Sequence, residues 1–216
     1  MIIQAKPLSH IFFNLVSFFI RQVLKVKFNK LVLSEFTLRS NHSYLLMCNH
    51  TSFWDGILAF YLCNELIRKK GTKGNLYTMV LEKQMQKNWW LKYAGAFSIA
   101  PGKSSVAESL TYATDILETP GNILLMYPQG KLESQYVRHI EVKDGIFEIA
   151  SKVNENCQLI WCSILFDYFE SLKPSIYFNL FDAGNNDNLD LKYFSDCINA
   201  FHLKAIKKQF RYTIEP

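Results

Sequence analysis

Residues 43–55 read SYLLMCNHTSFWD and join a short apolar run to a polar turn. The run at 43–48 predicts a strand that is buried on both faces. A helix is expected over 52–67, because Ser52 and Asp55 have the Ser-x-x-acid spacing of a capping box. A buried strand that leads directly into a helix is the repeating unit of an α/β sheet.

The same alternation continues along the rest of the chain. Further strands are expected at 76–81, 96–99, 122–127, 158–166 and 174–181, and further helices at 84–94, 104–118, 143–154 and 189–208. This order predicts an α/β fold, with a mostly parallel central sheet that helices cover on both faces. In such sheets, functional sites gather where strands end and helices begin.

The composition fits one globular domain and argues against a structural metal. Apolar residues make up 49% of the 216 residues and charged residues 20%, which is typical of a folded chain. The cysteines form no C-x-x-C pair and are scattered over Cys48, Cys63, Cys157, Cys162 and Cys197. Neither a disulfide framework nor a zinc site is therefore expected, and the histidines show no metal-ligand spacing.

The N-terminal segment, residues 1–40, carries the whole net charge of +5 beside a phenylalanine-rich stretch. Residues 8–25 predict a helix with one polar stripe of His10, Asn14, Ser17 and Arg21. The apolar run is shorter than the roughly 20 residues that span a bilayer, and no signal-peptide cleavage site follows it. We expect an amphipathic helix that associates with anionic membrane lipid. A first helix that packs into the core, with a solvated basic end, is the alternative.

His50 and Asp55 form the most informative pair of polar residues. If the turn between them folds back, the Asp55 carboxylate accepts a hydrogen bond from one nitrogen of the His50 ring. The other ring nitrogen is then available as a general base, with a substrate hydroxyl as the nucleophile. The simpler interpretation is that Asp55 only caps the helix and that His50 only ends the strand.

Three further stretches follow in chain order: GAFSIAP at 95–101, YPQGK at 127–131 and KDGIFEIA at 143–150. Together with Asn49, His50, Ser52 and Asp55, they resemble the conserved blocks of the 1-acylglycerol-3-phosphate acyltransferase family. The resemblance covers about residues 43–166. It identifies residues 41–216 as an acyltransferase domain, preceded by a membrane-associating segment over 1–40.

The resemblance implies that a fatty acyl group moves from acyl-CoA or acyl-carrier protein to a lipid hydroxyl, without a cofactor. His50 would remove the acceptor proton, and Asp55 would orient the imidazolium. The implied substrate-binding set is Asn49, Ser52, Lys103, Tyr127, Pro128, Gln129, Gly130, Lys131 and Arg138. The backbone N–H groups of Gly130 and its neighbours are candidate donors to an oxyanion or a phosphate. A peripheral or monotopic position on the cytoplasmic face of a membrane is expected, and nucleic acid is not an expected partner.

Three departures from the family pattern concern the acceptor. Gln129 stands where the family has a glutamate, and Leu132 and Pro101 stand where it has arginines. The cations left to hold an acceptor phosphate are Lys103, Lys131 and Arg138. A lysine lacks the bidentate fork of arginine, so a glycolipid, an amino-lipid or a pigment hydroxyl is an alternative acceptor.

Two other functions and one aromatic pair stay open at this point. A thioesterase would use the same His–Asp pair with water as the acceptor, and a lipid-binding protein would use the fold without catalysis. Trp89 and Trp90 fit either an interfacial aromatic belt or a helix that packs its aromatic face inward.

Overall fold

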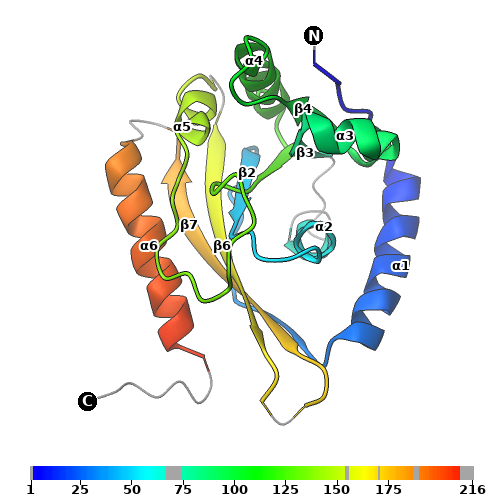
Figure 1. Ribbon diagram of the computed structural model, residues 1–216, viewed down its shortest axis with the longest axis vertical. Helices are drawn as coiled ribbons and strands as arrows, with labels where there is room; N and C mark the ends of the chain where they lie inside the picture. Colours follow the sequence, from blue (N-terminus) through cyan, green and yellow to red (C-terminus); the bar gives the residue numbers. More distant parts are fainter. Residues whose placement is uncertain (1, 67–73, 154–155, 170, 187–189, 210–216) are drawn as a thin grey trace.

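A computed structural model describes residues 2–66, 74–153, 156–169, 171–186 and 190–209, and its centre is one seven-stranded sheet (Figure 1). The strand order is β1-β7-β6-β2-β5-β3-β4. The strands are β1 (Leu31–Leu33), β2 (Ser43–Cys48), β3 (Leu76–Leu81), β4 (Ala96–Ile99), β5 (Ile123–Met126), β6 (Cys157–Asp167) and β7 (Ser175–Asn185).

The prediction of a mostly parallel sheet is confirmed. Only β6 and β7 pair antiparallel, as a hairpin, and the other neighbouring strands run parallel. Strand β1 was not predicted from the sequence. It has only three residues and pairs with β7, with Leu31 opposite Ile176. A run this short lacks the alternation that marks a longer strand.

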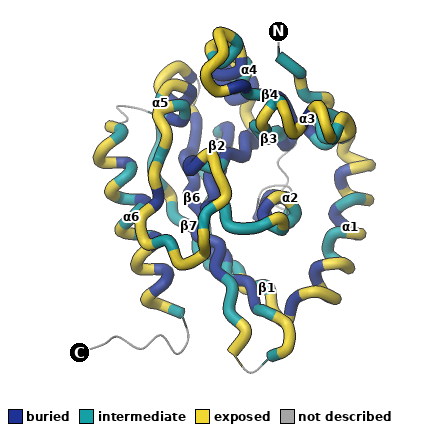
Figure 2. Tube along the Cα trace, in the orientation of Figure 1, coloured by how far each residue is buried: buried dark blue, intermediate teal, exposed yellow. Residues whose placement is uncertain are grey.

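Helices cover both faces of the sheet, as predicted (Figure 1). They are α1 (His10–Lys27), α2 (Asp55–Leu66), α3 (Glu82–Lys87), α4 (Val106–Leu117), α5 (Gly145–Ala150) and α6 (Leu191–Lys207). Along β2, Leu46 and Cys48 join the core under α1 and α2, whereas Leu45 and Met47 join the core under α4, α5 and α6. Figure 2 shows buried residues concentrated on the central strands, which explains why β2 has no polar face.

The helix predicted over 84–94 is two short elements. Helix α3 ends at Lys87, and a 3₁₀ helix, η2 (Trp89–Ala94), follows. Asn88 separates them because its side-chain amide donates to the Gln84 carbonyl at 3.1 Å, a local bond that competes with helix continuation. Gly95 ends η2 with φ 90°, and a Cβ there would lie 2.1 Å from the Leu76 carbonyl oxygen, so no other residue fits.

The N-terminal segment crosses the sheet from one edge to the other. Ile3 exchanges two hydrogen bonds with Ser98 of β4, N to Oγ at 2.8 Å and O to N at 3.0 Å, and β1 forms the opposite edge. At about 1.5 Å per residue the 18 residues of α1 reach about 27 Å, close to the ~29 Å width of seven strands. Residues 1–40 thus contribute an edge strand and core side chains to the same sheet as residues 41–216. No helix within the described ranges combines the length and hydropathy that a bilayer crossing requires.

Candidate active site

The topology brings two of the sequence blocks together. Strands β2 and β5 are parallel neighbours, with Met47 opposite Met126, so the segments that follow them leave the sheet side by side, at the carboxyl ends of the strands. His50 and Tyr127 meet there, and their rings stack with centroids 4.2 Å apart and planes 23° apart. The stacking restricts rotation of the His50 ring.

The His–Asp contact expected from the sequence is present. His50 Nδ1 lies 2.8 Å from Asp55 Oδ2. A carboxylate oxygen only accepts hydrogen bonds, so Nδ1 carries the proton and Nε2 keeps its lone pair. The Asp55 side chain is fully buried, whereas that of His50 is 27% exposed. The pair therefore has a buried acidic end and an accessible imidazole end.

Asp55 accepts three further hydrogen bonds from the turn before α2. The backbone N–H groups of Thr51 and Ser52 donate to Oδ2 at 2.5 and 2.8 Å, and the Ser52 hydroxyl donates to Oδ1 at 2.8 Å. The bond to the Ser52 N–H is the half of the capping box that the spacing predicts. Ser52 Oγ accepts from the Trp54 N–H at 3.2 Å, so the hydroxyl braces the turn. One carboxylate thus caps the helix and holds the His50 ring.

Asn49 is buried and pairs with the backbone of β6. Its Nδ2 donates to the Ile164 carbonyl at 3.0 Å, and its Oδ1 accepts from the Ile164 N–H at 2.7 Å. The side-chain amide of Asn49 thus both donates to and accepts from the backbone of Ile164, as the backbone of a neighbouring strand residue would. The pairing fixes the point where the chain leaves β2, one residue before His50.

The turn after β5 holds the backbone of His50. Gln129 is buried, and its Oε1 accepts from the His50 N–H at 2.6 Å. The Glu133 N–H donates to the His50 carbonyl at 2.9 Å, and Gln129 Nε2 donates to Glu133 Oε2. Sequence reasoning singled out Gln129 but missed Glu133. The only available signal was an acid four residues after the position where the family pattern has one.

Gly130 shapes this turn, but its N–H group is already used. It adopts φ 66°, and its N–H donates to the Tyr127 carbonyl at 3.0 Å. Of the backbone donors expected to bind an oxyanion, the Gly130 N–H is therefore occupied within the turn. The Pro128 carbonyl accepts from the Lys143 N–H at 3.2 Å, which ties the turn to the residues just before α5.

The three cations expected to hold an acceptor phosphate lie in different places. Lys103 Nζ is 2.6 Å from Glu82 Oε2, near the end of the edge strand β4. Lys131 Nζ is 3.2 Å from Glu133 Oε1. Arg138 is exposed beside α6, where the carbonyl of the preceding residue, Val137, lies 3.2 Å from His202 Nε2. The structure thus brings Lys131 near His50 and joins Lys103 and Arg138 to other elements.

The buried thiols near the sheet centre are poor nucleophiles. Cys48 lies opposite Cys162 in the β2–β6 ladder, and contact with the Cys162 thiol, together with burial, raises the pKa of Cys48. Burial also raises the pKa of Cys157 to about 11 and that of the Tyr127 phenol well above its usual value. These groups stay protonated at neutral pH. The described residues contain no cluster of His, Cys, Asp or Glu suited to a metal ion.

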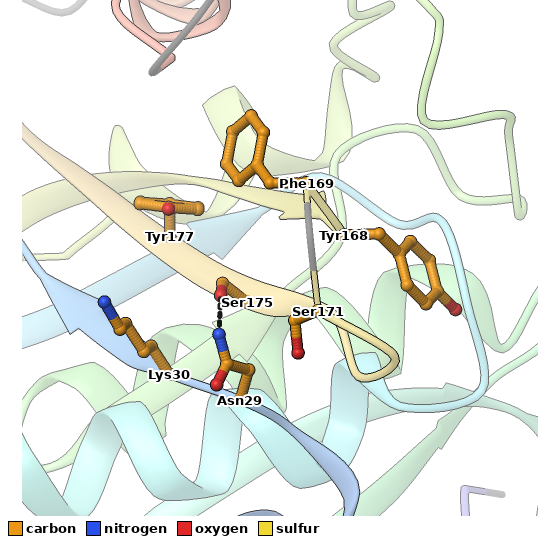
Figure 3. Close-up of a pocket in the computed structure, with 7 residues that line it drawn as sticks. All are labelled: Asn29, Lys30, Tyr168, Phe169, Ser171, Ser175 and Tyr177. Atoms are coloured by element: carbon orange, nitrogen blue, oxygen red, sulfur yellow. Dashed lines mark hydrogen bonds between the residues drawn. The ribbon is translucent and has the colours of Figure 1, made fainter.

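A pocket of about 440 Å³, which His50 does not line, lies where the segment after α1 meets the β6–β7 hairpin (Figure 3). Its lining includes Asn29, Lys30, Tyr168, Ser171, Ser175 and Tyr177. Asn29 Nδ2 donates to Ser175 Oγ at 3.3 Å across its floor. None of the site residues predicted from the sequence lines this pocket.

Comparisons with known proteins concern the fold and the family of the chain. The crystal structure of the 1-acyl-sn-glycerophosphate (LPA) acyltransferase PlsC from Thermotoga maritima resembles the chain with a TM-score of 0.64. The match covers 93% of this chain and 81% of PlsC at 14% identity, a likeness of fold. A comparison with curated protein sequences gives no match. A family model described as Acyltransferase matches residues 31–165, more than half of the chain, and so the chain belongs to the acyltransferase family.

Proposed function

We propose that this acyltransferase moves a fatty acyl group from acyl-CoA or acyl-carrier protein to the hydroxyl of a lipid. The observation that carries the proposal is the 2.8 Å contact between His50 Nδ1 and Asp55 Oδ2, which leaves Nε2 as an oriented acceptor at an accessible position. General-base catalysis requires this arrangement of a held ring and one available nitrogen.

In the proposed reaction, Nε2 of His50 takes the hydroxyl proton as the acceptor oxygen attacks the thioester carbonyl. The new C–O bond forms and the C–S bond breaks. The proton then passes from the imidazolium to the departing thiolate, so the products are an ester and a free thiol. Asp55 stabilises the transient positive charge on the ring and keeps Nε2 aimed at the acceptor. No step needs a covalent acyl-enzyme, in accord with the protonated thiols.

The ion pairs favour an acceptor without a phosphate monoester. Lys131 and Lys103 each contact a carboxylate, Glu133 and Glu82, so neither offers an uncompensated charge. Arg138, the third candidate, lies beside α6 and not in the turn that contacts His50. A phosphate monoester carries up to two negative charges and is bound best by arginine forks, which the chain lacks at 101 and 132. A glycolipid, an amino-lipid or a pigment hydroxyl fits this charge balance better than lysophosphatidate does.

We further propose that residues 1–40 bind the membrane surface, in a peripheral or monotopic position on its cytoplasmic face. Helix α1 packs on the body through Phe13 and Leu24, and Arg21 pairs with Glu65 of α2. Its outward face is apolar and exposes Ile11, Phe12, Leu15, Phe18, Phe19 and Val26. A wide exposed apolar face on a helix with lysines in its last turn is typical of an interfacial helix.

The 3₁₀ helix η2 adds a second exposed aromatic group. Trp89 and Trp90 are exposed, and no residue of η2 is buried, which overturns the alternative of inward packing. The Lys6 N–H donates to the Lys92 carbonyl at 2.7 Å, so η2 is joined to the segment just before α1. Tryptophan at such a position is suited to the headgroup region of a bilayer.

The test is acyl transfer by the purified full chain from labelled palmitoyl-CoA and palmitoyl-acyl-carrier protein. The acceptors are lysophosphatidate, a lysophospholipid mixture and a crude host-lipid extract. We expect labelled ester with the wild type and a loss of about 10²- to 10⁴-fold in His50→Ala. His42→Ala is the matched control, because His42 is a partly exposed histidine just before β2, at the opposite end of that strand from His50.

The products distinguish the competing functions. Ester formed only from the crude extract supports an acceptor without a phosphate monoester, whereas efficient transfer to lysophosphatidate contradicts that part of the proposal. Labelled free fatty acid without ester identifies a thioesterase. Equal and negligible turnover in the wild type and His50→Ala identifies a lipid-binding protein and refutes the proposed reaction.

A further inference from the structure

The turn after β5 contacts both backbone polar groups of His50. The His50 N–H donates to Gln129 Oε1 at 2.6 Å, and the His50 carbonyl accepts from the Glu133 N–H at 2.9 Å. Asp55 holds the ring of His50. The Gln129 amide could adopt two orientations in the same space, because its oxygen and nitrogen ends have nearly the same size.

Glu133 and the His50 N–H together favour one orientation of that amide. Gln129 Nε2 donates to Glu133 Oε2, and a carboxylate oxygen accepts but does not donate. If the amide turned over, its NH₂ group would face the His50 N–H and its oxygen would face the carboxylate. Gln129 is only 1% exposed, so its NH₂ group could not turn to water when it faced the His50 N–H. The native orientation is therefore the one in which all the groups are paired.

Glu133 is ionised at neutral pH. The hydrogen bond from Gln129 lowers the pKa of Glu133, and the nearby Lys131 lowers it further. At neutral pH the Glu133 carboxylate therefore only accepts hydrogen bonds, and it selects the NH₂ end of the Gln129 amide.

We propose that Glu133 is a positioning residue for His50, which orients the Gln129 amide that holds the His50 backbone. The inference rests on the proposed role of His50 as general base. A glutamate at 129 would accept the His50 N–H with either oxygen and would need no partner to orient it. In this chain the acid stands four residues later and acts through an amide.

A swap of the two side chains tests the coupling. In Glu133→Gln the new amide accepts as well as donates, so only the His50 N–H still favours the native orientation of Gln129. In Gln129→Glu two carboxylates face each other. In the double variant Gln129→Glu/Glu133→Gln, the carboxylate accepts from the His50 N–H and the new amide donates to it, so the native pairing is restored in reverse.

The first readout is turnover of palmitoyl-CoA with the acceptor mixture described above. We expect kcat to fall about 10-fold in Glu133→Gln and further in Gln129→Glu, with KM for palmitoyl-CoA nearly unchanged. The double variant should recover to within about threefold of the wild type. Glu141→Gln is the matched control, because Glu141 lies on the same loop and pairs with Lys143. Additive losses in the double variant would overturn the proposal.

The second readout does not depend on catalysis. Amide hydrogen exchange of His50 should accelerate at least 10-fold in Glu133→Gln and return in the double variant. The Thr51 and Ser52 amides, which donate to Asp55, serve as the internal reference and should be unchanged. This pattern in a protein that transfers no acyl group would reject the proposed function but support the link between Glu133 and His50. Unchanged exchange at His50 would refute that link even if the enzyme is active.

Discussion

Removal of two phenylalanines from the outward face of α1 should release the protein from membranes without unfolding it. Phe18 and Phe19 are 57% and 59% exposed, and their rings pack edge to face with centroids 5.7 Å apart. Burial of a whole phenylalanine contributes about 1.5–3 kcal/mol, so transfer of the exposed halves contributes about 1–1.5 kcal/mol each. The pair accounts for about 2–3 kcal/mol, or about a 30- to 150-fold change in the partition coefficient.

Flotation with vesicles that contain anionic lipid measures this change directly. Phe18→Ala/Phe19→Ala should bind about 30- to 150-fold more weakly and melt within a few degrees of the wild type. Tyr193→Ala is the control, because Tyr193 is 72% exposed on α6, which covers the other face of the sheet. Binding should also weaken at high salt, since screening reduces the attraction of the lysines of α1 to anionic lipid.

Point substitutions are preferable to deletion of the segment, because α1 also belongs to the core. Phe13 is buried and stacks on Phe60 of α2 at 4.3 Å, so Phe13→Ala should cost about 3–5 kcal/mol of stability. Loss of flotation after deletion of residues 1–28 would therefore not separate unfolding from release. If Phe18→Ala/Phe19→Ala floats like the wild type, the outward face of α1 is not the membrane contact and the reasoning is refuted.

Three further outcomes are expected. Burial lowers the pKa of His202, and the charge of Arg138 lowers it further, so as the pH falls His202 is protonated in the unfolded chain before it is protonated in the folded one. The free energy of unfolding, measured in urea, should therefore be constant above about pH 6.5 and decline as the pH falls below it. His202→Gln should reduce that decline. Gly130→Ala forces an alanine into φ 66° and should cost about 1–2 kcal/mol in the same melts, whereas a smaller loss would show that the turn relaxes. Iodoacetamide should leave the turnover of Cys197→Ser unchanged, because the other four cysteines are buried, and inactivation of that folded variant would contradict the absence of a thiol intermediate.

Local spacing explains which parts of the fold could be predicted. The strand and turn at 43–55 are specified by residues within one turn of each other, and the predicted contact between His50 and Asp55 is present. Strand β1 was missed because its three residues become a strand only by pairing with β7, which is far away in the sequence. The outward orientation of the phenylalanines of α1 was likewise left open, since periodicity gives the faces of a helix but not which one packs.

The candidate site shows the same contrast between contacts that local spacing fixes and contacts made at longer range. Of the block around His50, Asn49 is used by β6, and Ser52 and Asp55 are used by the turn, so only the His50 ring offers an accessible atom. These partners lie within six residues or on a neighbouring strand, and their spacing is therefore fixed. Glu133 works at longer range, through a buried amide, and is not bound to one position in the sequence. Residues that act in this way are difficult to predict, because neither a fixed spacing from His50 nor a position in the family pattern marks them.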